Sequence, residues 1–186
     1  MMDIIVIIPA YNEADSIFRV IREIPSIVSE IIVVDNNSTD RTALNARREG
    51  ATVLFEARGG YGYACLCGMD YISKKSKQPD IIVFMDGDFS DYPEELTKLV
   101  DPIIKNDVDL VIGARVKELR EEGSMTPQQV FGNKLATFLM KLLFNAKFTD
   151  LGPFRAIKYG NLLALRMEDK TYGWTVEMQV KVLKNN

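Results

Sequence analysis

Two carboxylates that could bind a metal ion follow a short apolar run. Asp86 and Asp88 flank Gly87 directly after the residues IIVFM at positions 81–85. The apolar run predicts a buried strand, and ligands of open α/β sheets bind beyond the carboxyl ends of the strands. Carboxylate oxygens suit Mg²⁺ or Mn²⁺, which also bind phosphate oxygens. The spacing therefore predicts a metal and phosphate site, although Asp and Gly are also common in plain strand–loop–helix turns.

Four other segments that we interpret as strands are also followed by polar residues. These segments cover residues 4–8, 31–34, 52–55 and 109–113. The polar residues after them are, in order, Tyr11, Asn12 and Glu13; Asp35 and Asn36; Arg58 to Gly62; and Arg115. Because parallel strands end at one edge of a sheet, we expect these residues to face one crevice.

The residue types in this crevice suit a nucleoside diphosphate. Asp35 can accept a hydrogen bond from an N–H on the edge of a base. The glycines of residues 59–62 allow a close approach to the backbone, and Arg58 can bind phosphate. A metal ion on Asp86 and Asp88 would bridge the two phosphates. A dinucleotide site fits less well, because the glycines follow the third strand and lack the G-x-G-x-x-G spacing.

Helices that position these loops are predicted between the strands. Apolar residues recur at helical spacing after residue 16, and further helices are expected over residues 41–48, 63–73 and 93–105. Strand and helix thus alternate up to residue 113. This alternation predicts an α/β fold with a mostly parallel central sheet and helices on both faces.

The composition excludes several functional classes. The chain has 186 residues, a net charge of −3 and no histidine, so histidine bases, histidine zinc sites and Ser-His-Asp triads are excluded. The charge gives no indication of a nucleic-acid partner. Cys65 and Cys67 are too close for an ordinary disulfide, which predicts free thiols in a reducing compartment. The apolar run 4–8 is too short for a signal peptide or a membrane span, so we expect a cytoplasmic protein.

The second part of the chain has a different pattern. Residues 115–126 are charged and predict a loop, and Pro127 begins a long predicted helix that ends near residue 145. Its Leu and Phe face, with lysines at the margins, suits packing on the sheet or peripheral contact with a membrane. A short strand near residue 156 and a helix from about residue 174 follow. The sequence stops within this predicted helix, which leaves room for a continuation of the chain.

These motifs together resemble the family 2 glycosyltransferases of the GT-A fold. The resemblance rests on PAYNE, VDNNSTDRT, the glycine-rich turn and MDGDFSDYPEEL, and it covers residues 4–115. The later GAR and TDLGPFRA segments look like the branch of dolichyl-phosphate mannosyltransferases and polyprenyl-phosphate glucosyltransferases. The resemblance implies one GT-A domain over residues 1–186, with a nucleotide-sugar-binding half (1–115) and an acceptor-side half (116–186).

The resemblance also implies roles for individual residues. The predicted nucleotide-sugar-binding residues are Pro9, Tyr11, Glu13, Asp35, Asn36, Arg58, Gly60, Gly62, Asp86, Gly87 and Asp88. Asp86 and Asp88 would hold Mg²⁺ or Mn²⁺, and the predicted catalytic residues are Asp88 and Glu177, the latter at the approximate place of an acidic base. Many members read VDDGS where this chain has VDNNS, so that Asn36 replaces a carboxylate. Positive charge is also missing where Gln128 and Gln129 stand, which leaves Arg115, Lys134 and Arg155 to bind an acceptor phosphate.

The predicted activity is metal-dependent, inverting transfer of a sugar from a UDP- or GDP-sugar to a polyprenyl phosphate at the cytoplasmic face of a membrane. Such an acceptor is already ionised and needs no strong base. One alternative is transfer to a saccharide or small-molecule hydroxyl, for which Glu177 would be the base. Another is a nucleotide-sugar binding module without catalytic activity.

Overall fold

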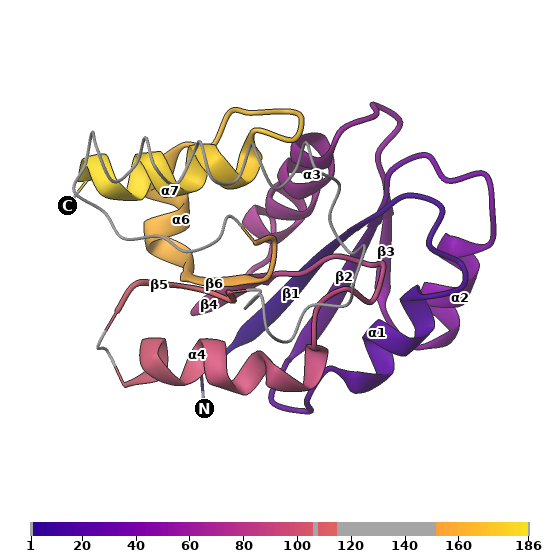
Figure 1. Ribbon diagram of the computed structural model, residues 1–186, viewed down its shortest axis with the longest axis horizontal. Coiled ribbons are helices and arrows are strands. Elements are labelled where there is room, and N and C mark those ends of the chain that lie inside the picture. Colours follow the sequence, from indigo (N-terminus) through magenta and orange to yellow (C-terminus); the bar gives the residue numbers. More distant parts are fainter. Residues whose placement is uncertain (1, 106–107, 115–151, 186) are drawn as a thin grey trace.

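The described residues fold around a central β-sheet that carries helices on both faces (Figure 1). The computed structural model describes residues 2–105, 108–114 and 152–185. The strands are β1 (Ile4–Ala10), β2 (Glu30–Asp35), β3 (Thr52–Phe55), β4 (Ile81–Phe84), β5 (Leu110–Ile112) and β6 (Arg155–Lys158). The helices are α1 (Ile17–Glu23), α2 (Thr42–Arg48), α3 (Tyr61–Ser73), the 3₁₀ helix η1 (Pro93–Glu95), α4 (Leu96–Ile104), α6 (Tyr159–Leu165) and α7 (Trp174–Asn185).

Six strands of the described ranges form one mixed sheet in the order β3-β2-β1-β4-β6-β5. β3, β2, β1 and β4 pair in parallel, with Val6 of β1 opposite both Ile31 of β2 and Val83 of β4. β6 runs antiparallel to both β4 and β5. The predicted α/β fold with a mostly parallel sheet is therefore confirmed, and the direction of β6 is a feature that the sequence did not reveal.

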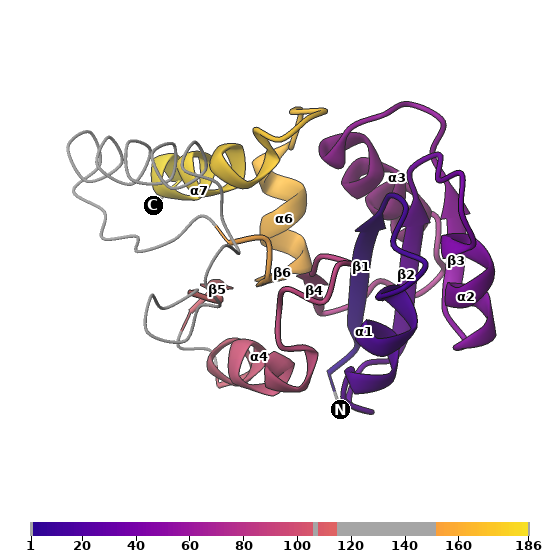
Figure 2. The same ribbon diagram turned by 45° about the vertical axis from the view of Figure 1, so that its right-hand side comes forward.

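Apolar residues on both faces of the sheet form two cores. Ile4, Val6 and Ile8 of β1 pack with α1, α2 and α4, whereas Ile5 and Ile7 pack with α3, α6 and α7 (Figure 2). Each of these five side chains is at most 2% exposed, and burial of such a side chain stabilises a fold by about 1.5–3 kcal/mol. Burial on both faces explains why β1 is an unbroken apolar run.

Helix α3 packs directly on β1 at Gly68. A Cβ atom at this position would lie 2.9 Å from Cγ2 of Ile7, so glycine is needed for the close approach of the helix. Cys65 and Cys67 on the same helix are free thiols, as predicted, and burial raises the pKa of both. The packing of α3 on β1 at Gly68 also positions the first turn of α3, which follows β3 and lies near the carboxyl ends of the strands.

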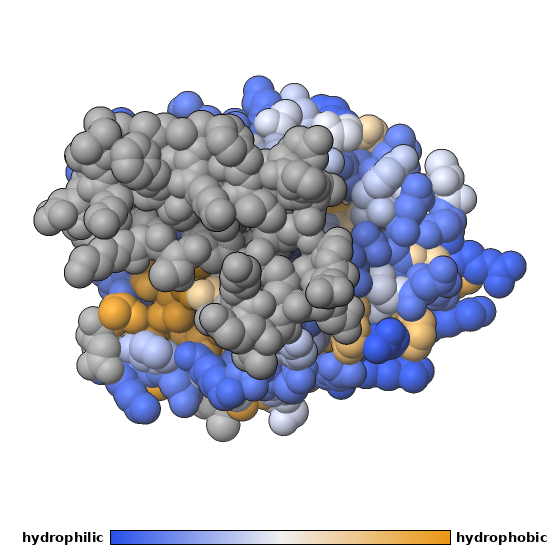
Figure 3. All heavy atoms as spheres, in the orientation of Figure 1, coloured by the Kyte–Doolittle hydropathy of each residue, from blue (hydrophilic) through white to orange (hydrophobic). Residues whose placement is uncertain are grey.

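The surface of the described residues is unevenly apolar (Figure 3). It is mainly hydrophilic over α1 and α2, and an apolar area is exposed at the β5 end of the sheet, where Ile104 and Val108 are partly exposed. None of the helices in the described ranges is long and apolar enough to cross a bilayer. The predicted helix from Pro127 and the predicted acceptor residues Arg115 and Lys134 lie outside the described residues.

Candidate functional site

The loops after β1 and β2 are joined by hydrogen bonds into one unit. Asn12, at φ 57°, donates its backbone N–H to Ser38 Oγ (2.9 Å), and its side-chain Oδ1 accepts from the N–H of Thr39 (2.8 Å). The N–H of Glu13 donates to Thr42 Oγ1 at 2.7 Å. These contacts explain the VDNNSTDRT motif, because its hydroxyl and amide groups hold the first loop in place. Sequence reasoning did not identify Ser38, Thr39 and Thr42 as residues that shape the site.

Gly87 brings the carboxylate loop against this unit. A Cβ atom at Gly87 would lie 3.5 Å from both Ala10 Cβ and Glu13 Cγ, so the two loops lie close together. Burial raises the pKa of Glu13, a hydrogen bond from Ser16 opposes the shift, and the negative charge of Asp88 raises the pKa further. Glu13 and Asp88 therefore lie close enough to repel each other, and a cation between the loops would relieve this repulsion.

Within the carboxylate loop, the two predicted metal ligands differ in exposure. Asp86 is half-buried and its N–H donates to Asp91 Oδ2 (3.3 Å), whereas Asp88 is exposed and its Oδ1 accepts from the N–H of Ser90 (2.9 Å). Phe89, which follows Asp88, has φ 64°, and the centre of its ring lies 4.0 Å from the guanidinium carbon of Arg19. The Asp91 side chain folds the loop back on Asp86, and η1 has no side-chain cap.

The carboxylate loop fits a divalent cation only together with a ligand. In residues 2–105, 108–114 and 152–185, no group of three or more His, Cys, Asp or Glu side chains is placed to hold a metal ion. Asp86 and Asp88 supply hard oxygen donors, and Mg²⁺ and Mn²⁺ commonly complete their coordination with water and substrate phosphate. The donor set is therefore suited to a metal ion that arrives with a diphosphate.

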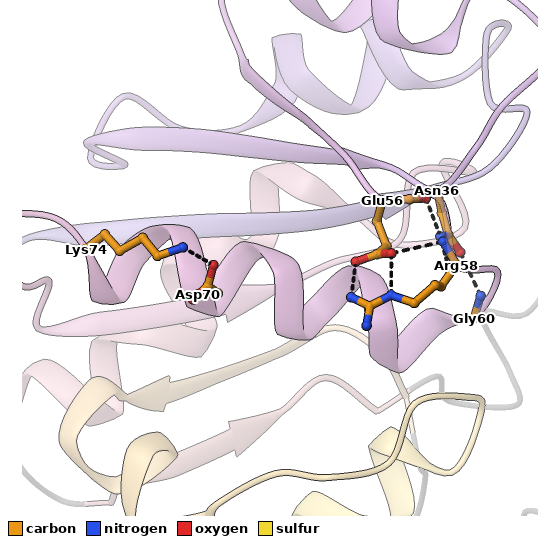
Figure 4. Close-up of polar contacts among 6 residues, drawn as sticks. All are labelled: Asn36, Glu56, Arg58, Gly60, Asp70 and Lys74. Carbon is orange, nitrogen blue, oxygen red and sulfur yellow. Dashed lines mark hydrogen bonds and ion pairs between the residues drawn. The ribbon is translucent and has the colours of Figure 1, made fainter.

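The side-chain amide of Asn36 is used in hydrogen bonds to the backbone of the turn after β3 (Figure 4). Its Nδ2 donates to the carbonyl oxygens of Glu56 (3.1 Å) and Arg58 (2.7 Å), and its Oδ1 accepts from the N–H of Gly60 (2.9 Å). The side chain is buried. These contacts favour a structural role for Asn36 over the predicted contact with a nucleotide. A carboxylate could not donate either hydrogen bond, which explains why this chain has an amide where the resembled family often has an acid.

Arg58 is held in an ion pair with Glu56. Two parallel hydrogen bonds of 2.8 and 2.7 Å join the guanidinium to the Glu56 carboxylate (Figure 4). The guanidinium carbon also lies 4.4 Å from the centre of the Tyr63 ring. The hydrogen bond from Arg58 lowers the pKa of Glu56 although burial opposes the shift. The Arg58 side chain is 66% exposed, so a phosphate could approach it but would compete with Glu56.

The glycine turn is occupied by the protein itself. A Cβ atom at Gly60 would lie 2.3 Å from Lys170 O, and one at Gly62 would lie 2.1 Å from Asp169 O. The N–H of Gly62 donates to Thr171 O, and that of Tyr63 donates to Lys170 O, both at 3.2 Å. This packing of residues 169–171 on the first turn of α3 favours a structural role for Gly60 and Gly62 over the predicted approach of a phosphate.

Glu177 anchors this same segment to α7. Its carboxylate accepts from the N–H groups of Glu168 (2.9 Å) and Asp169 (2.8 Å) and pairs with Lys181 at 2.7 Å. Burial opposes ionisation, but the hydrogen bond from Lys181 and those from the two backbone amides lower the pKa of Glu177. This geometry does not support the predicted role of a general base, since the carboxylate is engaged and has a reduced proton affinity.

Of the remaining predicted site residues, three are buried and one is exposed. Pro9 is buried within β1, and the buried Asp35 at the end of β2 accepts from the N–H of Ser38 (3.1 Å). Tyr11 is 60% exposed beside them. Arg155 is fully buried and donates to the carbonyl of Gly152, so its position does not suit the predicted contact with an acceptor. The structure thus brings the loops after β1, β2 and β4 together, with Asp88 and Tyr11 exposed.

Comparison with known proteins identifies relatives over most of the chain. The family model described as glycosyl transferase family 2 matches residues 5–162. An uncharacterized glycosyltransferase of Mycobacterium tuberculosis is 31% identical over 176 residues, which cover 95% of this chain and 77% of that protein. The UDP-N-acetylglucosamine–dolichyl-phosphate N-acetylglucosaminyltransferase of Methanococcus voltae is 29% identical over 168 residues, which cover 79% of this chain and 65% of that protein.

Solved structures show the same architecture. The crystal structure of glucosyl-3-phosphoglycerate synthase from Mycobacterium tuberculosis, in complex with Mn²⁺, UDP-glucose and glycerol 3-phosphate, matches with a TM-score of 0.76 and 25% identity. The match covers 99% of this chain and 66% of that chain, so this chain spans about two thirds of the length of the synthase. The structural neighbours are glycosyltransferases of the GT-A fold, which confirms the predicted fold.

Proposed function

This chain belongs to glycosyl transferase family 2, and we propose that it uses a divalent cation to transfer a sugar from a nucleoside-diphosphate sugar to a phosphate-bearing acceptor. The observation that carries this proposal is the close approach of Gly87 to Ala10 and Glu13, which would lie 3.5 Å from a Cβ atom at position 87. This approach places the carboxylate loop beside the loops that follow β1 and β2. The loop that carries the exposed carboxylate Asp88 thus lies near the loop that carries the exposed Tyr11, and the buried Asp35 stands at the end of the neighbouring strand β2.

Each part of this arrangement has a role in binding the donor. Tyr11 and Asp35 would contact the nucleoside, and Asp86 and Asp88 would hold Mg²⁺ or Mn²⁺ on the diphosphate. The bound cation would neutralise the charge that develops on the leaving diphosphate as the glycosidic bond breaks. Glu13 adds negative charge to the same place and favours the cation further. UDP and GDP both remain compatible with a carboxylate such as Asp35.

The acceptor is best described as a phosphate that attacks the anomeric carbon from the face opposite the diphosphate, with inversion. A phosphate monoester is already ionised near neutral pH and does not need a base. The engagement of Glu177 with two backbone amides and Lys181 supports such an acceptor over a hydroxyl. The name of the Methanococcus voltae relative includes a dolichyl phosphate, which favours a polyprenyl phosphate and, with it, work at the cytoplasmic face of a membrane.

A small phosphorylated molecule that accepts the sugar through a hydroxyl group is the second candidate acceptor, and this transfer would need a base. It is favoured by the structural likeness to the glucosyl-3-phosphoglycerate synthase that was crystallised with glycerol 3-phosphate. In both cases, residues 1–115 would bind the donor and residues 116–186 would belong to the acceptor side.

Nucleotide binding and transfer test this proposal in two steps. UDP-, GDP-, ADP- and dTDP-sugars are first compared by thermal shift with Mn²⁺ and with EDTA. We expect one donor to stabilise the chain only with Mn²⁺, by about 2.7 kcal/mol at a donor concentration about 100 times its dissociation constant. The radiolabelled donor is then offered to polyprenyl phosphate in detergent micelles and to 3-phosphoglycerate. Failure of every donor to bind in the presence of Mn²⁺ would contradict the proposal, and the labelled product distinguishes the two acceptors.

A further inference from the structure

Phe55 exposes an apolar ring at the end of β3, an edge strand of the described sheet. The residue is 62% exposed, and its side chain has no polar atom that could use the solvent. Burial of such a ring is among the larger stabilising contributions available to a fold, and most of it is not realised here. A single exposed apolar residue needs no explanation by itself, so the place of Phe55 in the molecule decides what its ring can do.

The exposed aromatic side chains of residues 2–105, 108–114 and 152–185 all lie near the carboxyl ends of the parallel strands. They are Tyr11 after β1, Phe55 at the end of β3, Tyr92 after β4, and Tyr172 next to the residues that pack on the first turn of α3. Tyr71, near the other end of α3, is by contrast partly buried. This distribution favours a ligand at this edge of the sheet over scattered exposure.

The register of the sheet sets Phe55 beside Asp35. The two residues are paired on the parallel strands β3 and β2, and Ala10 of β1 is the other partner of Asp35. Val33 and Val53 pack in the core with α1, α2 and α4, and residues two apart in a strand share a face. The side chains of Asp35 and Phe55 are therefore directed to this same side of the sheet, from strands about 4.8 Å apart.

Hydrogen bonds fix both residues at their strand ends. Oδ1 of Asp35 accepts from the N–H of Ser38 at 3.1 Å, and its carbonyl oxygen accepts from the N–H of Glu56 at 3.0 Å. The second bond continues the pairing of β2 and β3 just beyond Phe55, so the backbone that carries the ring is held in place. An aromatic ring on a fixed backbone has two side-chain torsion angles and can bind a ligand at a low cost in conformational entropy.

A planar base bound to Asp35 would present one of its faces to this ring. An N–H on the edge of the base donates to the carboxylate and leaves both faces of the base free. Stacked aromatic rings have centres about 4.5–7 Å apart, which agrees with the spacing of neighbouring strands. Phe55 has no charge and no hydrogen-bonding group in its side chain, so neither the diphosphate nor the metal ion is a suitable partner for it.

We propose that Phe55 stacks on the nucleobase of the donor and forms, with Asp35, the part of the site that binds the base. This inference rests on the proposed function, because a base lies at Asp35 only within that proposal. Asp35 would recognise the edge of the base, whereas Phe55 would add affinity through its face.

Calorimetry with two variants of Phe55 tests the inference. The probe is UDP or GDP with Mn²⁺, whichever the wild-type chain binds. We expect the dissociation constant to rise about tenfold in Phe55→Ala and about fivefold in Phe55→Leu, which keeps apolar bulk but loses the ring. The melting temperature without nucleotide should stay within about 2 °C of wild type, because the ring is exposed. Leu163→Ala, at an exposed apolar residue of α6, is the matched control and should leave the affinity unchanged.

Phe55→Trp gives a direct readout of stacking. Trp174 is the single tryptophan of the chain and is 0% exposed, so the indole at position 55 would be the one that a base can reach. We expect the nucleotide with Mn²⁺ to quench the fluorescence of Phe55→Trp and to leave that of Leu163→Trp unchanged.

Two results overturn the inference while the wild-type chain still binds nucleotide. One is wild-type affinity in Phe55→Ala, and the other is intact binding by Phe55→Trp without quenching. Absence of Mn²⁺-dependent nucleotide binding by the wild-type chain would contradict the proposed function, and the inference with it. The two failures are distinguishable, because only the second removes binding by the wild-type chain.

Discussion

The carboxylate loop (residues 86–91) follows β4 and the glycine turn (residues 58–62) follows β3, two parallel strands of the same sheet. The two loops nevertheless have opposite relations to their surroundings. The carboxylate loop packs its glycine against the protein and exposes Asp88. In the glycine turn, Gly60 and Gly62 lie directly under the backbone of residues 169–171. One loop therefore offers its polar groups to a ligand, whereas the other uses them to hold a distant segment of the chain.

This difference shows that a glycine near a helix N-terminus has two physical explanations. Glycine allows a phosphate to approach the backbone, and it equally allows another stretch of backbone to do so. In α3 the carbonyl groups of Lys170 and Thr171 accept from the first-turn N–H groups. The two loops should therefore respond in opposite ways to substitution, with loss of ligand binding in the first and loss of stability in the second.

Asp88→Asn should have the largest effect on function. Loss of an exposed carboxylate ligand should weaken Mn²⁺-dependent nucleotide binding and transfer by about 100-fold or more. The melting temperature should stay within about 2 °C of wild type, because Asp88 is exposed and makes one local hydrogen bond. Asp70→Asn, on the exposed surface of α3, is the matched control and should change neither property. If nucleotide binding by Asp88→Asn depended on Mn²⁺ as it does in wild type, the carboxylate loop would not be the metal site and would not differ from the glycine turn in this respect.

Gly62→Ala should have the largest effect on stability. The added Cβ atom would lie 2.1 Å from Asp169 O, and the backbone of either segment must move to admit it. We expect a loss of about 1–3 kcal/mol in the free energy of unfolding, measured by urea denaturation. Gly160→Ala is the control, because its Cβ atom would meet nothing within 4 Å, and it should be neutral or slightly stabilising. Equal stability of both variants would mean that the turn is open to a ligand after all.

Asn36→Asp should be the next most destabilising change. The carboxylate would lose the two hydrogen bonds to the carbonyls of Glu56 and Arg58 and face them with negative charge. We expect a loss of about 1–3 kcal/mol in urea denaturation at pH 7. Asn37→Asp, at the exposed next position, is the control and should cost less than about 0.5 kcal/mol. If Asn36→Asp strengthened nucleotide binding at no cost in stability, the amide would belong to the ligand site and not to the turn.

The sequence was a good guide to features that depend on local pattern. Continuous apolar runs such as residues 4–8 predicted strands buried on both faces, because burial on both sides removes the need for alternation. The ends of those strands then predicted which loops would meet. Gly87 could be predicted as a site residue because the apolar strand before it and the two carboxylates beside it lie within a few residues in the sequence.

The sequence was a poor guide where a residue's partner is distant in the chain. Gly62 contacts Asp169, and Arg155 is set by its register opposite Phe84. Neither pairing leaves a periodic signal, so the glycine turn was interpreted as a phosphate site and the buried arginine as an acceptor contact. Glu177 was difficult for the same reason, because the backbone amides that occupy its carboxylate have no side-chain signature.

Glu177→Gln should have the smallest effect of this series, and it shows how firmly the glycine turn is closed. The amide keeps one acceptor oxygen, which can accept from the N–H of Asp169, but its NH2 group would face the N–H of Glu168 and it loses the ion pair with Lys181. We expect a loss of about 1 kcal/mol at pH 7 in urea denaturation. The pKa of Glu177 is lowered in the folded chain, so its stabilising contribution is present above the pKa of the unfolded state and disappears as the pH falls through the folded value.

The difference between wild type and Glu177→Gln should therefore narrow steadily as the pH is lowered below the ordinary range of glutamate titration. Transfer to a phosphate acceptor should keep its rate and its pH profile in this variant, because the carboxylate would position residues 168–169 and would not accept a proton. If turnover instead fell about 100-fold or more while donor binding was unchanged, Glu177 would be a base and the acceptor a hydroxyl. A stability difference that does not depend on pH would mean that the carboxylate does not hold this segment, and the closed state of the glycine turn would need another cause.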